Sequence, residues 1–96
     1  MITSFADKET AKVFAGEFSK KLPRDIQFGA LQKLMVLDQC EDLALLWSLP
    51  GLKTEKLTVK GSDDVWSIRI NRQWRIVFHW NGIPPEASSV EICDYH

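Results

Sequence analysis

Two arginines on either side of a short polar segment suggest a site for an anion. If residues 71–73 form a three-residue hairpin loop, Ile70 lies opposite Trp74, and Arg69 lies opposite Arg75 on the other face. Two like charges facing each other across a sheet destabilise it modestly, and an anion bound between them removes that cost. Two guanidinium groups have the geometry to bind a phosphodiester. The pattern therefore predicts a phosphate site, with a solvated outer face of a sheet as the alternative.

Acid–base groups follow at the end of the chain. Asp94, Tyr95 and His96 bring together a carboxylate, a phenol and an imidazole. A well-placed group of this kind accelerates proton transfer by about 10²–10⁴-fold. His79 is expected on the same face as Arg75, either as the acid–base partner of His96 or as a solvated surface histidine. A frayed polar terminus is the alternative explanation for the last three residues.

The distribution of charge favours a local anion site over a broadly basic surface. The 96 residues carry a formal net charge of −1 at pH 7, which is unfavourable for non-specific binding of nucleic acid. Residues 51–80 nevertheless carry six Lys and Arg against three Asp and Glu, and residues 81–96 carry three acidic residues and no basic one. Lys56 and Lys60 alternate with Leu57 and Val59, so we expect both lysines to join the surface of the two arginines.

The composition narrows the class of protein. With 45% hydrophobic and 26% charged residues, the chain is typical of a globular protein, and we expect residues 1–96 to form one domain. Without a run of ~20 apolar residues or a recognisable secretory signal, the expected location is the cytoplasm. Cys40 and Cys93 are expected to be thiols without a chemical role, and the Cys and His spacings do not fit a zinc site. We expect no metal or other cofactor.

Two helices are expected in the first half of the chain. Asp7 is the predicted N-cap of the first helix, which residues 20–23 end. Its apolar side is predicted to contain Ala11, Phe14, Ala15 and Phe18. The second helix begins near Pro23, and its core-facing stripe is predicted to contain Ile26, Ala30, Leu34 and Leu37. Residues 42–49 form a shorter helix or turn, which Pro50 and Gly51 close.

Strands are expected around these helices. Residues 2–5 predict a first strand, and residues 56–60, 65–70, 74–80 and 90–95 predict four more. We expect the last strand to lose its regular pleat after Cys93, with Asp94 near the edge of the core and His96 in the cleft. The fold class is therefore α+β: an N-terminal strand, two helices and an antiparallel four-strand meander packed against the helices.

Three sequence motifs together resemble the HigB toxins of the RelE/ParE superfamily. They are WSIRIN at 66–71, QWRI at 73–76, and the ending VEI at 90–92 followed by DYH at 94–96. The opening Ile-x-Ser-Phe at 2–5 and the Lys60-Gly61 turn also fit, so the resemblance spans the whole chain. It implies a RelE-like fold and the toxin of a bacterial type II toxin–antitoxin pair. Such a toxin cuts mRNA in the ribosomal A site without a metal and is held inactive by a helix-turn-helix, HigA-type antitoxin.

The resemblance also implies roles for individual residues. Asp94, Tyr95 and His96 form the catalytic ending, and Arg75 stabilises charge in the transition state. Either Asp94 or His96 is the base. Lys60 binds the RNA backbone. Independently of the resemblance, the basic residues Lys56, Arg69 and Arg72 are also predicted to bind RNA.

Three features depart from the family pattern. Ser62-Asp63-Asp64 stands where the family often has Asp or Asn followed by Arg, and Leu57 stands where it often has His or Glu. The overall charge is also lower than is typical of the family, and Arg72, where the family often has Asp, partly compensates for it. A non-nucleolytic protein of the same fold, either a gyrase poison or a catalytically weakened toxin, is the alternative function. The expected partners are the antitoxin and the ribosome with mRNA in its A site. We expect no membrane association, and specific DNA binding only through the antitoxin.

Overall fold

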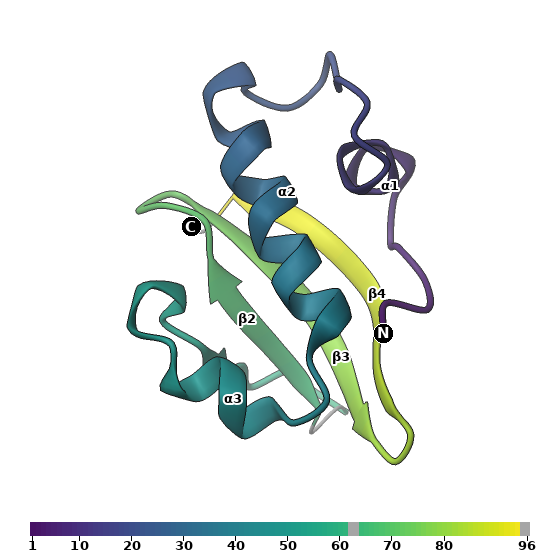
Figure 1. Cartoon of the computed structure of the whole chain (residues 1–96), viewed down its shortest axis with the longest axis vertical. Helices are drawn as coiled ribbons and strands as arrows, with labels where there is room; N and C mark the ends of the chain where they lie inside the picture. Colours follow the sequence, from purple (N-terminus) through teal and green to yellow (C-terminus); the bar gives the residue numbers. More distant parts are fainter. Residues whose placement is uncertain (62–63, 95–96) are drawn as a thin grey trace.

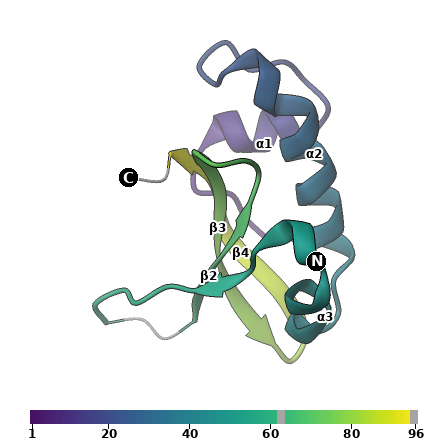
Figure 2. The same ribbon diagram turned by 90° about the vertical axis from the view of Figure 1, so that its left-hand side faces the viewer.

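A layer of helices covers one face of an antiparallel sheet and leaves the other face open (Figures 1 and 2). The computed structural model describes residues 1–61 and 64–94. The helices are α1 (Lys8–Phe14), α2 (Arg24–Gln39) and α3 (Leu43–Ser48), followed by a 3₁₀ turn at Pro50–Leu52. The strands are β1 (Glu55–Lys56), β2 (Val65–Arg69), β3 (Trp74–Gly82) and β4 (Pro85–Asp94), and the sheet order β1-β2-β3-β4 is the expected meander. Among the described residues, no helix has the length and apolarity needed to cross a membrane.

Helix α2 supplies the helical half of the core. The predicted stripe is confirmed, because Ile26 is 4% exposed and Ala30, Leu34 and Leu37 are fully buried. These side chains share one cluster with residues of β2, β3 and β4. Full burial of an aliphatic side chain of this size contributes about 1.5–3 kcal/mol, so α2 is held mainly by this contact.

Helix α1 begins where the sequence predicts and ends earlier. The Asp7 carboxylate accepts a hydrogen bond from the Thr10 amide at 2.7 Å, which caps the first turn. The helix ends at Phe14, because Gly16 takes a left-handed conformation with φ +83°. The predicted apolar side is therefore confirmed only in part: Phe14 packs against the core, whereas Phe18 lies beyond the helix and is 58% exposed. The fully buried residues of the helix are Thr10 and Val13, which the prediction did not include.

Polar contacts fix the segment between α1 and α2. The buried Gln27 side chain accepts from the Ser19 amide at 2.9 Å and donates to the Ser19 carbonyl at 2.7 Å. The Ser19 hydroxyl donates to the Glu9 carboxylate at 2.6 Å, and this hydrogen bond lowers the pKa of Glu9 below its ordinary value. These contacts tie the loop to both helices.

The first residues do not form the predicted N-terminal strand. Ile2 and Phe5 make two isolated parallel bridges to β4, at Ala87 and Val90. Between these two points β4 is irregular, since Ser89 takes a positive φ of 50° and the register with β3 shifts between Val77 and His79. Because of this bulge, residues 2–5 cannot pair with β4 as a continuous parallel strand. They pair with it only before the bulge, at Ala87, and after it, at Val90.

The central hairpin has the predicted register. Ile68 pairs with Ile76 and Arg69 pairs with Arg75, and the Ile70 amide donates to the Trp74 carbonyl at 2.9 Å. The last strand begins at Pro85, earlier than predicted. Its bulge places both Ala87 and Val90 in the core, which an uninterrupted strand could not do.

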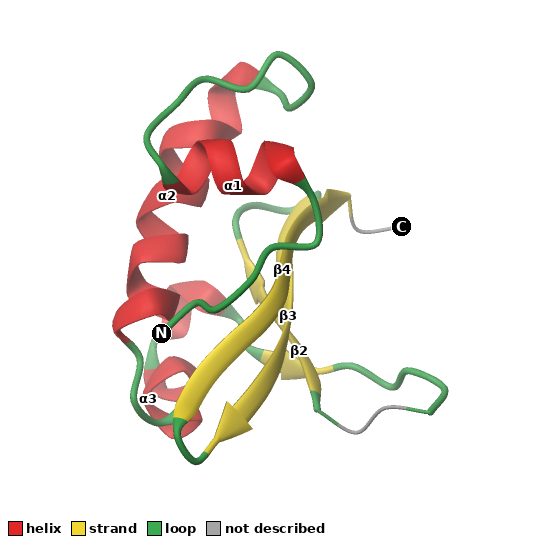
Figure 3. Cartoon of the chain, turned by 90° about the vertical axis from the view of Figure 1, so that its right-hand side faces the viewer, coloured by secondary structure: helices red, strands yellow, loops and turns green. Residues whose placement is uncertain are grey.

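The segment before β2 is less regular than predicted. Residues 56–60 do not form a continuous strand, because β1 contains only Glu55 and Lys56. Residues 57–61 follow and project from the open side of the sheet (Figures 2 and 3), with the Leu57 amide donating to the Val65 carbonyl at 2.9 Å. The short helix expected over 42–49 is present as α3, capped by the Asp42 carboxylate.

Candidate functional site

The open face of the sheet carries the two arginines. Trp66, Ile68 and their partners on β3 face the helices, so Arg69 and Arg75 point to the opposite side. Figure 3 shows this side of the sheet free of helices, with the end of β4 projecting from it. Both arginines are half-buried, and Arg75 lies opposite Cys93 of β4.

The turn between β2 and β3 brings the two guanidinium groups to one point. Arg69 Nε donates to the Asn71 carbonyl oxygen at 3.1 Å, and Arg75 Nη1 donates to the same oxygen at 2.6 Å. The Asn71 side chain accepts from the amides of Gln73 and Trp74, each at 2.8 Å, and so fixes the turn. Two positive charges are thereby held side by side at the edge of the open face.

The same turn holds the carboxylate of Asp94. Asp94 pairs with Trp74 across the sheet, and its Oδ2 accepts from Gln73 Nε2 at 2.9 Å. Because Trp74 packs against the core, the register directs Asp94 to the helix side of the sheet edge, as predicted. The strand remains paired with β3 through Asp94, so the predicted loss of regular structure does not begin there, and the rest of that prediction lies outside the described residues.

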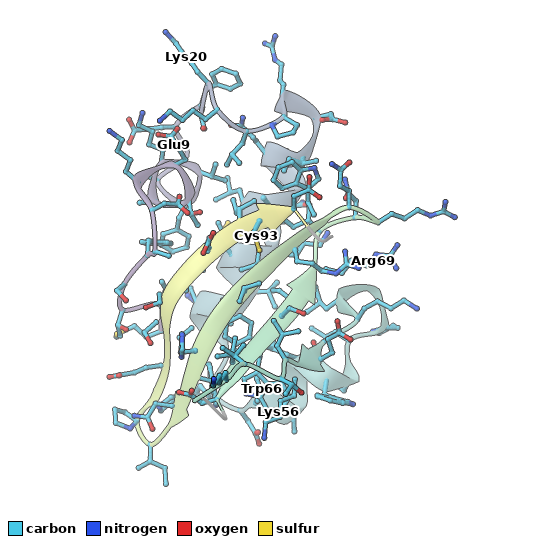
Figure 4. The ribbon with its side chains drawn as sticks, turned by 180° about the vertical axis from the view of Figure 1, so that it is seen from behind. Glu9, Lys20, Lys56, Trp66, Arg69 and Cys93 are labelled. Atoms are coloured by element: carbon cyan, nitrogen blue, oxygen red, sulfur yellow. The ribbon has the colours of Figure 1, made fainter. Side chains whose placement is uncertain are left out.

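The remaining basic residues divide into two groups. Arg72 is exposed in the turn itself, and Lys60 is exposed on the segment that projects from the open side. Lys56 does not join this surface: it pairs with Trp66, on the helix side of the sheet, and its Nζ lies 5.9 Å from the Trp66 ring centroid. Figure 4 shows Lys56 and Trp66 together, well separated from Arg69. The predicted shared face fails because β1 ends at Lys56 and the alternation does not continue.

Two further groups lie on the open face. His79 Nδ1 is 3.3 Å from Asp64 Oδ1, and the Trp80 amide donates to the Asp64 carbonyl at 2.9 Å, so this end of β3 is joined to the residue before β2. Burial raises the pKa of the Cys93 thiol, and the nearby carboxylates of Glu91, Asp7 and Asp94 add to the effect. The thiol is therefore protonated at neutral pH, which disfavours it as a nucleophile.

Four residues of interest lie outside the described part of the chain. They are Ser62 and Asp63 of the polar turn, and Tyr95 and His96 of the predicted catalytic ending. The suggested pairing of His79 with His96 and the predicted position of His96 also fall there. Among the described residues, no three His, Cys, Asp or Glu side chains gather as a metal site would require.

Sequence reasoning missed the residues that organise the site. Asn71 and Gln73 were considered only as loop residues, yet Asn71 holds both arginines and Gln73 holds Asp94. An Asn at the start of a tight turn often accepts hydrogen bonds from the backbone amides two or three residues later, and this signal could have identified Asn71. The resulting arrangement offers two adjacent cations for a phosphate and, at the same end of the sheet, a carboxylate able to transfer protons.

Comparison with known proteins agrees with this geometry. Residues 3–96 match the family model described as the RelE-like toxin HigB of type II toxin–antitoxin systems. The chain is 32% identical over 82 residues to Toxin HigB-1 of Vibrio cholerae serotype O1, and the alignment covers 83% of this chain and 84% of that protein.

Proposed function

The chain belongs to the HigB-like toxins of type II toxin–antitoxin systems, and on that premise we propose that it is a metal-independent endonuclease that cuts mRNA in the ribosomal A site. The observation that carries this proposal is the convergence of Arg69 and Arg75 on one carbonyl oxygen, in the turn whose Gln73 binds Asp94 at the same end of the sheet. Two guanidinium groups held this close together in the free protein are electrostatically unfavourable, and a phosphodiester between them offsets the repulsion.

The reaction is an attack by the nucleotide's own 2′-hydroxyl. A base removes the 2′-hydroxyl proton, the 2′-oxygen bonds to the adjacent phosphorus, and the bond from phosphorus to the 5′-oxygen breaks. An acid returns a proton to that leaving oxygen. The products are a 2′,3′-cyclic phosphate and a 5′-hydroxyl end, and water opens the cyclic phosphate to a 3′-phosphate. No oxidant or second substrate is required.

Each step has a candidate residue in this chain. Arg75 and Arg69 stabilise the charge that accumulates on the phosphate oxygens, where donors fixed in advance are most effective. Asp94 and the terminal Tyr95 and His96 supply the proton transfers, with Asp94 or His96 as the base. Gln73 orients the Asp94 carboxylate through the 2.9 Å hydrogen bond.

RNA binding extends from this centre along the open side. Arg72 beside the arginine pair and Lys60 on the projecting segment contact the RNA backbone. Lys56 is not included, because its ammonium group lies against Trp66 on the other side of the sheet. The ribosome supplies the mRNA, and the expected inhibitor is a helix-turn-helix antitoxin. The site of action is the cytoplasm.

The experiment compares cleavage by three versions of the chain on translating ribosomes. The wild type should cut mRNA in the presence of EDTA and leave 5′-hydroxyl ends. Deletion of residues 95 and 96 should reduce the cleavage rate by about 10²–10⁴-fold for each acid–base group lost. Arg75→Ala should reduce it by about 10²–10³-fold, the usual cost of one donor to a developing anion.

Two results would contradict the proposal. Growth arrest with intact mRNA would move the activity to a protein target, and relief of that arrest by a resistant gyrase would identify the target. Full toxicity after deletion of residues 95 and 96 would remove the catalytic role of the chain end. Circular dichroism of each variant separates lost catalysis from lost folding.

A further inference from the structure

Exposed apolar side chains gather on the helical side of the molecule. In the described part of the chain, ten large hydrophobic side chains are exposed, and three of them, Met1, Val59 and Ile83, lie outside α2, α3 and their adjoining loops. The other seven belong to α2, α3 and their adjoining loops: Phe18, Phe28, Met35, Val36, Leu45, Trp47 and Leu49. Clusters of this kind on a globular protein mark surfaces that bind another molecule.

Four of these side chains, Met35, Val36, Leu45 and Leu49, line a groove between α2 and α3. Its volume is about 420 Å³, and we call it the α2–α3 groove. The exposed side chains that line it include Met35 at 54%, Leu45 at 58% and Leu49 at 43% exposure. Its floor includes the buried Leu46 and Cys40. The lining is almost entirely apolar, so the groove suits hydrocarbon side chains and not a nucleotide.

The solvent side of α2 lacks the charges that a free helix usually carries there. Phe28, Gln32, Met35 and Gln39 recur at helical spacing along this side, and all four are exposed and uncharged. Most charges lie towards its two ends, although Lys33 is half-buried in its middle. The start carries Lys20, Lys21 and Arg24 with one acidic residue, Asp25, and the end carries Asp38, Glu41 and Asp42.

We propose that the α2–α3 groove binds the antitoxin, and this proposal rests on the toxin function proposed above. A stable protein complex buries about 1,200–2,000 Å² around an apolar centre, and the helical side offers such a centre whereas the open face offers arginines and carboxylates. The segment that fits is an amphipathic helix with large apolar residues three and four positions apart. Charge complementarity places its acidic end near Arg24 and its basic end near Glu41 and Asp42.

The position of the groove separates inhibitor binding from catalysis. The helices and the open face lie on opposite sides of the sheet (Figures 2 and 3), so a substitution in the groove leaves the arginine pair unchanged. Variants of the groove should therefore remain toxic and escape the antitoxin. Variants of Arg75 should be harmless and still bind it.

The test introduces a carboxylate at two exposed positions of the groove, in Met35→Glu and Leu45→Glu. The matched control is Ile83→Glu, since Ile83 is 92% exposed in the turn between β3 and β4. The probe is the purified protein encoded by the gene adjacent to this one, titrated calorimetrically into each full-length variant. Each groove variant should weaken binding by about 30-fold or more, and the control should bind as the wild type does.

The readouts distinguish the two proposals. Met35→Glu and Leu45→Glu should keep the wild-type melting temperature and cleavage rate, and their growth arrest should no longer be relieved by the adjacent gene. Unchanged affinity in both groove variants would overturn the docking surface, even though cleavage by the wild type would still support the toxin function. Failure of the wild type to bind the probe would also overturn it. A third result would also overturn the proposal. If the chain alone forms a dimer, and Met35→Glu dissociates it, the groove binds a second copy of this chain.

Discussion

Replacement of Asn71 by alanine should weaken both the fold and the activity, because one side chain organises the whole turn. Its Oδ1 accepts two backbone amides at 2.8 Å, from Gln73 and Trp74. Its carbonyl oxygen accepts hydrogen bonds from Arg69 and Arg75. The side chain of Gln73 in turn donates a hydrogen bond to Asp94. Alanine removes the two side-chain hydrogen bonds and keeps the carbonyl.

The expected loss follows from these contacts. A hydrogen bond of this type contributes about 0.5–1.5 kcal/mol, and since Asn71 is exposed we expect about 1–2 kcal/mol in total for the free energy of unfolding. In a chain of this size that lowers the melting temperature by about 4–16 °C. A catalytic group misplaced by about 1 Å costs about 10²-fold in rate, so cleavage should fall by about 10–100-fold.

The assay combines thermal unfolding with cleavage kinetics, and Asn71→Asp is the matched control. Aspartate retains an acceptor oxygen for the two amides, so its melting temperature should stay at or above that of the wild type. Its negative charge beside the arginines should weaken RNA binding, which appears in KM more than in kcat. A melting temperature of Asn71→Ala equal to that of the wild type, or an unchanged cleavage rate, would refute the role of the turn.

Three further outcomes are expected. Arg69→Ala should lower the cleavage rate less than Arg75→Ala does. Its melting temperature should equal or exceed that of the wild type, because the repulsion between the two guanidinium groups is removed. If Arg75→Ala does not fold, Arg75 has a structural role instead. Thr10→Val should lower the free energy of unfolding by about 1–3 kcal/mol, because the buried Ile92 amide of β4 loses its hydrogen-bond acceptor. An unchanged midpoint in urea titrations would contradict this. The Ser19 hydroxyl lowers the pKa of Glu9 below the ordinary 4.5. The ionised Glu9 carboxylate therefore adds its full contribution to the free energy of unfolding above pH 4.5, and this contribution is lost as the pH falls through the pKa of Glu9 in the folded protein. The difference in free energy of unfolding between wild type and Ser19→Ala should accordingly shrink in acid. A difference that does not change with pH would contradict this role of Ser19.

The parts of the fold that the sequence predicts well are those fixed by a repeating apolar pattern. The α2 stripe recurs over three turns, and burial leaves it only one orientation. In the central hairpin, a one-residue slip would exchange Ile68 and Arg69 between core and solvent, so the register follows from the faces alone.

The remaining features depend on contacts that a local pattern does not contain. The bulge at Ser89 changes the phase of β4, and with it the pairing of the first residues. Lys56 lies on the helix side because it pairs with Trp66 across the sheet. At the site, the residue types predicted the arginine pair, whereas the roles of Asn71 and Gln73 required knowledge of which atoms meet across the turn.

The pairing of the first residues with β4 affects when the fold of this protein can be completed during its own synthesis. The Ala87 amide donates to the Met1 carbonyl, and the Ile92 amide donates to Thr10 Oγ1 across 82 residues of sequence. At about 5–20 residues per second, the ribosome makes these N-terminal groups several seconds before their partners exist. The strand that completes the sheet is also the one that carries Asp94 to Gln73. A partly synthesised chain thus has neither its final sheet nor its carboxylate in place, so the proposed site assembles only once β4 has been made.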